Sequence, residues 1–542
     1  MNKECGCLME RNDLTKLAKL VAKDVAAGQP GDYSLAASRL LEASPEAALD
    51  LVDLLLAEGR RKRPNQKLIS ACVFLFGQAL EYLRYGVEAG HGEARSHVDA
   101  VCARLLAAGR QGEAAPELLL LLLTEFATAK LDPGEELRAL MIELLERNAD
   151  QAPAAIDTGQ MAEFAAELAK SVKGDVFALH AHLTEMGAAF PEEHRGAMAA
   201  MLLQSGEPVA REAAVGWVLD PSPMVRASVA RSLAEAAPQG LVSPVMLRRM
   251  IAVRNWLPEA GGGRSALDQA IQACRRKGVE CASWPEAQVR DVLASGVDGS
   301  GAVGILVICR EGRRHALASV LLKHGIGVRD AWAQHGMSRA EVEDIQLRAG
   351  GSVDQHAVDR EFLGTATAHF LAVSLETGTL PPFGLVDFLE TVGLHSVQPE
   401  LLPTEALLAM LEQGIEPEAR TPAALDGQLR EGVDLADEYS FLDSWFEDGD
   451  QVQALLGGKR LSRAKGEAVV LEQVLEPRRR RWADLLAWTA FLLSRSDEHE
   501  RWLDFYAAAR ALVEGRGVGD IPVMRYVARQ TVEAQRQRQL WR

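Results

Sequence analysis

The stretch DPSPMVRASVARSLAEAA, residues 220–237, decides the fold class of this chain. The side-chain oxygen of Ser222 can cap a helix N-terminus, and Pro223 suits the first helical position, where it removes no needed backbone donor. Apolar residues then recur at every fourth position on one face: Val225, Val229 and Leu233. The preceding stretch EPVAREAAVGWVLD is also amphipathic. The pattern therefore predicts a hairpin of two short helices.

Two short helices joined by D-P-S-P, the second opening with Val-Arg, resemble a HEAT repeat over residues 207–237. The positions that match are Asp220, Val225, Arg226, Val229, Ala230 and Leu233. The resemblance implies an α-solenoid in which the aspartate and the arginine link adjacent units; it implies no activity, because such scaffolds serve many functions. The alternative is an ordinary helical hairpin, since the flanking segments do not clearly repeat the pattern at a spacing of roughly 40 residues.

Composition and capping signals extend the helical prediction along the chain. Hydrophobic residues make up 48% of the sequence and aromatic residues only 5%, which favours helix-on-helix packing over sheets. Ser44-Pro45 and Asp132-Pro133 each read as a helix start. We therefore expect a mainly α protein, with a HEAT-like, α-solenoid-like array over residues 13–290.

A change of pattern at residues 294–332 predicts a small sheet. The run ILVIC at residues 305–309 favours a strand, and Glu311-Gly312 can turn the chain into a second one. We expect a hairpin near residues 304–322 within a small α+β segment, residues 296–400. Helices resume at Ser338, where Glu341 completes a capping box.

Charge divides the last part of the chain, which we expect to form a C-terminal helical region over residues 401–542. Residues 385–450 contain 16 acidic residues and two arginines, whereas residues 459–542 contain 17 basic and 11 acidic residues. The whole chain has 59 basic and 76 acidic residues, a net charge of −17. This balance disfavours general binding to nucleic acid or to anionic membranes, because polyanions are repelled on average.

Neither a disulfide framework nor a membrane span is expected. The seven cysteines are odd in number and irregularly spaced, and the pair Cys5 and Cys7 lacks the second pair that a metal site normally needs. The N-terminus does not resemble a signal peptide. The most apolar run, Leu118–Leu123, is far shorter than the roughly 20 residues that span a bilayer. We expect a cytoplasmic protein without a metal or cofactor.

One region offers residues for an enzyme, around residues 296–335. Three glycines there spell G-x-G-x-x-G (Gly299, Gly301 and Gly304), but they precede a predicted strand, which is the wrong order for a dinucleotide site, and read as a flexible loop. Three histidines lie near Cys309 in the sequence: His315, His324 and His335. An enzyme with its site here predicts a buried pocket with titratable groups.

Two groups of arginines beside a tryptophan are candidate binding surfaces, because this pairing is favoured at protein interfaces and on nucleic acids. The first follows the hairpin: Arg248, Arg249, Arg254 and Trp256. The second lies in EPRRRRW: Arg478, Arg479, Arg480, Arg481 and Trp482. The leading hypothesis is a non-catalytic scaffold that binds another protein through the first group. The alternatives are nucleic-acid binding through the second group, the enzyme, and arginines that only satisfy helix ends or pair with the acidic segment.

Overall fold

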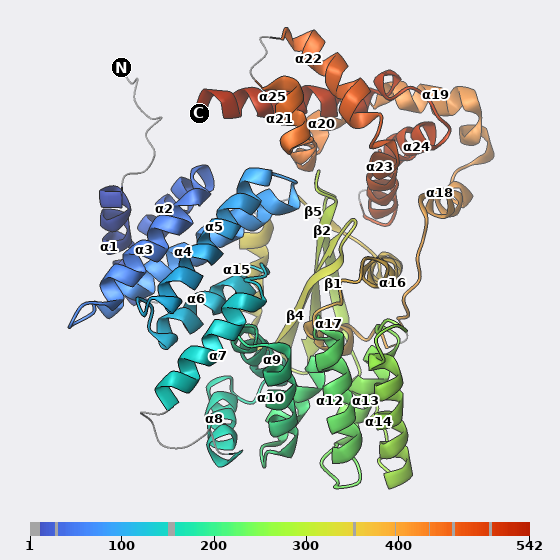
Figure 1. Cartoon of the computed structure of the whole chain (residues 1–542). Coiled ribbons are helices and arrows are strands. Elements are labelled where there is room, and N and C mark those ends of the chain that lie inside the picture. Colours follow the sequence, from blue (N-terminus) through green and yellow to red (C-terminus); the bar gives the residue numbers. More distant parts are fainter. Residues whose placement is uncertain are drawn as a thin grey trace. The chain divides into compact units, whose positions relative to one another are not determined.

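The computed structural model describes residues 11–27, 31–149, 158–350, 354–395, 397–432, 434–457, 461–497 and 501–541. Cys5 and Cys7 lie outside these ranges, as do residues 458–460 between the acidic and the basic segments. The fold is mainly helical and contains one small antiparallel sheet (Figure 1). It divides into two compact units, the first ending at Ala210 and the second spanning Arg211–Leu540. Within the described residues, no helix is long and apolar enough to cross a membrane.

The first unit consists of helices. Their bounds are α1 Arg11–Ala27, α2 Asp32–Ala43, α3 Ala48–Gly59, α4 Gln66–Glu88, α5 Gly92–Arg110, α6 Pro116–Thr128, α7 Glu135–Ala149, α8 Thr158–Ser171, α9 Val176–Gly187 and α10 Glu192–Gln204. The long helix α4 is central, because it contacts α1, α2, α3, α5 and α6. Phe76 of α4 meets Phe126 of α6 edge to face, with ring centroids 5.9 Å apart. A single apolar core extends from α1 to α7.

Two helix starts in this unit differ from the sequence prediction. Before α3 the chain forms one 3₁₀ turn, Pro45–Ala47, and the Ser44 side chain makes no capping bond. Helix α7 begins at Glu135, later than predicted, because the Asp132 carboxylate accepts a hydrogen bond from the Gly134 backbone (3.0 Å). Gly134 has φ +88°, a left-handed conformation that no α-helix contains.

The predicted hairpin comes next, and the second unit begins within its first helix. Its helices are α11 Pro208–Ala214, continued by the 3₁₀ helix Val215–Leu219, and α12 Pro223–Ala236; α13 Pro244–Arg254 and α14 Gly263–Lys277 follow. Ser222 caps α12 as predicted, accepting from the backbone of Met224 and Val225. Arg226 donates to the carbonyl oxygens of Asp220 and Pro221, both at 2.7 Å, and so closes the turn of its own hairpin.

The sheet has five antiparallel strands in the order β4-β3-β2-β1-β5. Their bounds are β1 Val289–Ser295, β2 Ala302–Glu311, β3 Arg314–Lys323, β4 Gly327–Met337 and β5 Gln355–Ala357. Strands β2 and β3 are the predicted hairpin, with Glu311 opposite Arg314 and Gly312 at φ +59° in the first turn position, which suits a type II′ turn. The prediction missed the other three strands.

Helices cover both faces of the sheet (Figure 1). On one face, α15 (Arg339–Gly350) packs through Val342 against Ile308, Leu317 and Met337. Its start is the predicted capping box, since Ser338 and Glu341 exchange both hydrogen bonds (2.7 and 3.3 Å). Helices α16 (Arg360–Thr377) and α17 (Gly384–Val392) contact β3 and β4.

The remaining helices form the C-terminal part of the second unit. They are α18 Thr404–Gln413, α19 Pro422–Glu431, α20 Leu435–Glu438, α21 Asp450–Leu456, α22 Arg463–Val470, α23 Arg479–Ser494, α24 Trp502–Val513 and α25 Pro522–Trp541. Buried aromatic rings pack between them, including Trp445 against Trp482 with centroids 5.4 Å apart. The predicted domain boundaries at residues 290, 296, 400 and 401 stay predictions.

Candidate functional site

Arg248 and Arg249 are adjacent on α13. This helix starts behind Ser243, whose side-chain oxygen accepts from the Met246 backbone (3.2 Å). Both arginines are buried, with 6% and 7% of their surface exposed. A buried charge that lacks an opposite charge and hydrogen bonds lowers the free energy of unfolding by several kcal/mol, as the removal of one partner from a buried ion pair shows (about 3–5 kcal/mol). Their partners therefore decide what they do.

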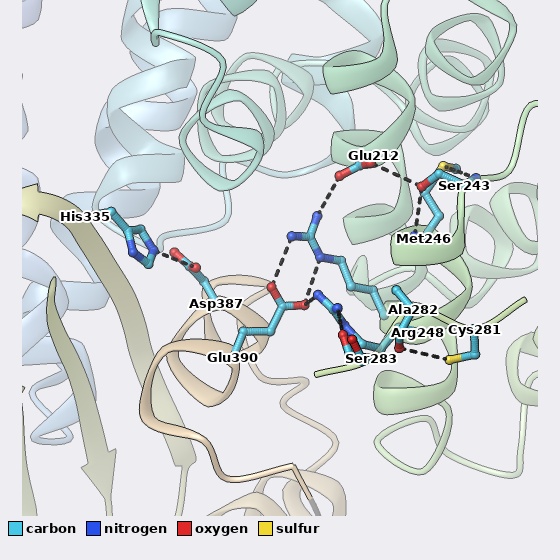
Figure 2. Close-up of polar contacts among 11 residues, drawn as sticks. Glu212, Ser243, Met246, Arg248, Cys281, Ala282, Ser283, His335, Asp387 and Glu390 are labelled. Atoms are coloured by element: carbon cyan, nitrogen blue, oxygen red, sulfur yellow. Dashed lines mark hydrogen bonds and ion pairs between the residues drawn. The ribbon is translucent and has the colours of Figure 1, made fainter. Parts of the chain in front are cut away.

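Glu390 of α17 receives both guanidinium groups (Figure 2). Its Oε1 accepts from Arg248 Nη2 at 2.8 Å and from Arg249 Nε at 3.1 Å, and its Oε2 accepts from Arg249 Nη2 at 3.2 Å. Arg249 also donates to Glu212 of α11 at 3.2 Å, and Arg248 to the Ser283 carbonyl at 2.5 Å. Two arginines and two glutamates thus form one ionic cluster.

The cluster joins segments that lie far apart in the sequence. Glu390 is 141 residues from Arg249, and it sits on the helix that packs against β3 and β4. A guanidinium group keeps its charge at any physiological pH, so the cluster cannot transfer protons through its arginines. Its chemistry suits holding α13 against α17. The predicted role of Arg248 and Arg249 in partner binding stays a prediction.

Arg254 and Trp256 occupy different surroundings. Arg254 pairs with Asp268 of α14, with Nη2 donating to Oδ2 at 2.9 Å, and both side chains are about one-third exposed. The hydrogen bond from Arg254 lowers the pKa of Asp268. The Trp256 side chain is buried, with 1% of its surface exposed. The role of these two residues in partner binding likewise stays a prediction.

His335 of β4 is held between two carboxylates, which the sequence did not suggest. Its Nδ1 lies 2.6 Å from Glu311 Oε1 and its Nε2 lies 3.3 Å from Asp387 Oδ1. The hydrogen bond to Asp387, together with that to Glu311, raises the pKa of His335 to about 9. Asp387 is one turn before Glu390 on α17 (Figure 2), so a protonated His335 adds a third cation beside the ionic cluster.

The enzyme hypothesis placed its pocket around residues 296–335. The cavity found there, lined by His324 among apolar side chains, has a volume of about 10 Å³, room for roughly one water. His324 pairs with Asp484 at 3.0 Å, and burial raises the pKa of the Cys309 thiol to about 11. Among the described residues, no group of three or more histidines, cysteines or carboxylates is arranged to hold a metal ion.

The glycine loop connects β1 to β2 and is closely packed, whereas the sequence suggested a flexible loop. Gly301 has φ +80° and donates to the Asp298 carbonyl at 2.8 Å. A Cβ on Gly299 would lie 1.9 Å from the Ser444 carbonyl oxygen. A strand–loop–strand unit offers no helix N-terminus to a pyrophosphate, so the G-x-G-x-x-G pattern here does not form the dinucleotide arrangement.

The second arginine group surrounds Glu447, which lies in the acidic segment. Glu447 is buried and pairs with Arg478 and with Arg481, the latter at 3.2 Å. Its Oε1 also accepts from Trp482 Nε1 at 2.7 Å.

The other two arginines of this group differ from each other. Arg479 donates to the carbonyl oxygens of Leu512 and Arg516 near the end of α24. Arg480 is exposed. Three of the four arginines therefore have the intramolecular roles that the sequence offered as the alternative, pairing with the acidic segment or satisfying a helix end. Nucleic-acid binding through this group stays a prediction.

An open groove lies between α4 and α6 of the first unit. It has a volume of about 400 Å³. Its lining residues are Gln66, Ile69, Ser70, Val73, Phe74, Gly77, Gln78 and Glu81 of α4, and Leu121, Glu125 and Thr128 of α6. Leu121 is 49% exposed, although its neighbours Leu119 and Leu122 are fully buried. The spacing of Leu121, Glu125 and Thr128 on one helical face is the signal that was missed.

Glu125 gives the groove a charge. Burial, together with the negative charge of Glu185 on α9, raises the pKa of Glu125 to about 7. Burial also raises the pKa of Glu185. Within the residues that the structure describes, Glu125 forms no ion pair. The groove thus combines apolar walls with a half-buried carboxylate.

Comparison with known proteins gives three findings. Residues 191–278 match the family described as the Y4lR second domain, and residues 405–536 match the Y4lR C-terminal helical domain. The chain is 29% identical over 379 residues to a protein of Sinorhizobium fredii (strain NBRC 101917 / NGR234) named "Uncharacterized protein y4lR", covering 69% of this chain and 72% of that one. No solved structure matches the chain.

Proposed function

We propose that this protein is a non-catalytic scaffold that binds another protein, and that the groove between α4 and α6 is a docking surface for it. The observation that carries the proposal is the groove itself, which is open, has a volume of about 400 Å³, and is lined by apolar and polar side chains on a unit made of packed helices. Exposed apolar surface of this kind, bordered by polar residues, is typical of protein-binding sites.

The packing beneath the groove supports the proposal. Buried leucines on the opposite side of α6, such as Leu119 and Leu122, anchor the helix in the core, and Phe76 holds α4 against it. A groove built on such fixed helices keeps its shape before a partner arrives, which lowers the ordering cost of association.

The HEAT-like character of the α11–α12 hairpin belongs to the same proposal. The capped start of α12 fits such a repeat, whereas Arg226 bonds to the turn of its own hairpin and not to an adjacent unit. Repeat arrays use exposed helix faces as binding surfaces because each unit buries only its faces toward its neighbours.

The test compares a groove variant with a matched control. Leu121→Asp places a charge on an exposed position inside the groove, and Leu145→Asp places one on an exposed position of α7, outside it. The wild-type chain and both variants are used to capture proteins from cells of the source organism, and the amount of each captured protein is compared among the three. Each candidate is then purified and tested for direct binding. A protein that binds the wild type and Leu145→Asp but not Leu121→Asp supports the proposal. Equal binding by all three contradicts it.

A further inference from the structure

The groove has the length and the composition of a site for one helix. Lining residues of α4 run from Gln66 to Glu81, so the lined face of α4 extends about 22 Å at 1.5 Å per residue, and that of α6, from Leu121 to Thr128, about 10 Å. They follow one face of α4, at Gln66, Ser70, Phe74, Gly77 and Glu81. A ridge of side chains from a third helix fits between two neighbouring helices. A helix that binds in such a groove inserts apolar side chains that are three to four residues apart in its sequence.

The Glu125 carboxylate lies against Gly77 of α4. A Cβ on Gly77 would stand 2.2 Å from Glu125 Oε2, so only glycine lets this carboxylate rest against the backbone of α4. The carboxylate is therefore set into the floor of the groove between the two helices. Phe74 and Leu121, which also line the groove, supply apolar surface near it.

A cation from a partner is the missing complement to this carboxylate. The Glu185 carboxylate of α9 acts on Glu125, and a third acidic side chain, Glu81, lines the same groove. His182 acts on Glu185 and can carry a positive charge. Burial of a carboxylate next to other carboxylates is relieved when an opposite charge arrives. The net charge of −17 also draws a basic partner toward the chain.

We infer that the partner segment is an amphipathic helix that buries leucine-like side chains in the groove and places a lysine or arginine on Glu125. This inference rests on the proposed function, because it specifies the chemistry of what the groove binds. The predicted segment is about four turns long, from the length of the lined face of α4.

The experiment uses a displayed library of 18-residue helical peptides, selected on the full chain. Leucines are fixed at positions i, i+4, i+7 and i+11, and the positions between them on that face are randomised. Selected peptides are synthesised and their affinities are measured by fluorescence anisotropy against the wild type, Leu121→Asp, Glu125→Gln and Leu145→Asp. A second peptide, with norleucine in place of the selected cation, completes a double-mutant cycle with Glu125→Gln.

The expected result is enrichment of lysine or arginine at one position, with binding weakened about 10-fold or more by Glu125→Gln and no further by norleucine in that variant. Peptides that need Leu121 but show no cation preference and no loss with Glu125→Gln overturn the inference and leave the docking surface standing. Failure to select any peptide whose binding depends on Leu121 overturns the docking surface as well.

Discussion

Replacing Glu390 by glutamine is expected to loosen the contact between α13 and α17. The glutamate carboxylate accepts three hydrogen bonds from two buried arginines, and the neutral amide offers one acceptor oxygen in its place. Arg249 keeps the Glu212 carboxylate, whereas Arg248 keeps only uncharged partners, the Ser283 carbonyl and the Trp284 ring. Breaking a buried pair while leaving its partner charged costs about 3–5 kcal/mol.

Hydrogen exchange of the intact chain, measured by mass spectrometry on its peptides, reports this loss of stability separately for each helix. A loss of 3–5 kcal/mol corresponds to exchange that is roughly 150- to 5,000-fold faster in peptides from α13 and α17. The matched control is Asp268→Asn, which breaks the pair with Arg254 of the same helix α13; both side chains of this pair are about one-third exposed. Such a pair is worth about 0.2–1 kcal/mol, so its exchange is expected to rise only a few-fold.

The exchange rates of the two variants in α13 and α17 show whether Glu390 holds these helices together. If Glu390→Gln accelerates exchange in α13 and α17 no more than Asp268→Asn does, the cluster does not hold these helices together. If α13 alone responds, Glu390 does not connect it to α17.

Three further predictions concern protonation and reactivity. Glu125→Gln is expected to raise the melting temperature at pH 8, and the gain vanishes near pH 4.5, because a carboxyl whose pKa rises to about 7 costs stability once it ionises; a gain that is equal at both pH values contradicts this. His335→Gln is expected to lower stability at pH 6 but not at pH 10, because a pKa raised to about 9 gives stability that is present below the ordinary pKa and lost through 9; an equal loss at pH 10 refutes the charged pairing. Iodoacetamide at pH 8 is expected to label exposed Cys281 quickly and to spare Cys72, whose pKa burial raises to about 12; peptide mass spectrometry shows the order of labelling, and Cys72 labelled first refutes it.

Local chemistry made part of the fold predictable from the sequence. The cap at Ser222, the capping box at Ser338 and the turn at Gly312 each depend on residues within three or four positions, and the structure confirms all three. The edge strand β4 was missed because its sequence, GVRDAWAQHGM, does not alternate regularly between apolar and polar residues. Only its pairing with β3 identifies it as a strand.

The candidate sites depend on contacts that the sequence does not encode locally. Glu390 meets Arg249 across 141 residues, so no spacing rule links them. Arg248 and Arg249 looked like an exposed surface because arginine is usually exposed, whereas the long-range pairing with Glu390 buries them. The groove forms because α4 and α6 are neighbours. The periodicity of apolar residues predicts which face of each helix is buried but not which helices pack together, so the groove could not be predicted.

Photo-cross-linking from inside the groove tests the central claim most directly. A benzophenone amino acid replaces Ser70, an exposed lining residue of α4, and in a control replaces Ala100, an exposed residue of α5, in cells of the protein's source. The account predicts a discrete protein adduct from position 70 that Leu121→Asp removes and that position 100 does not form. No adduct at position 70, or the same adduct from both positions, would contradict the groove as a docking surface.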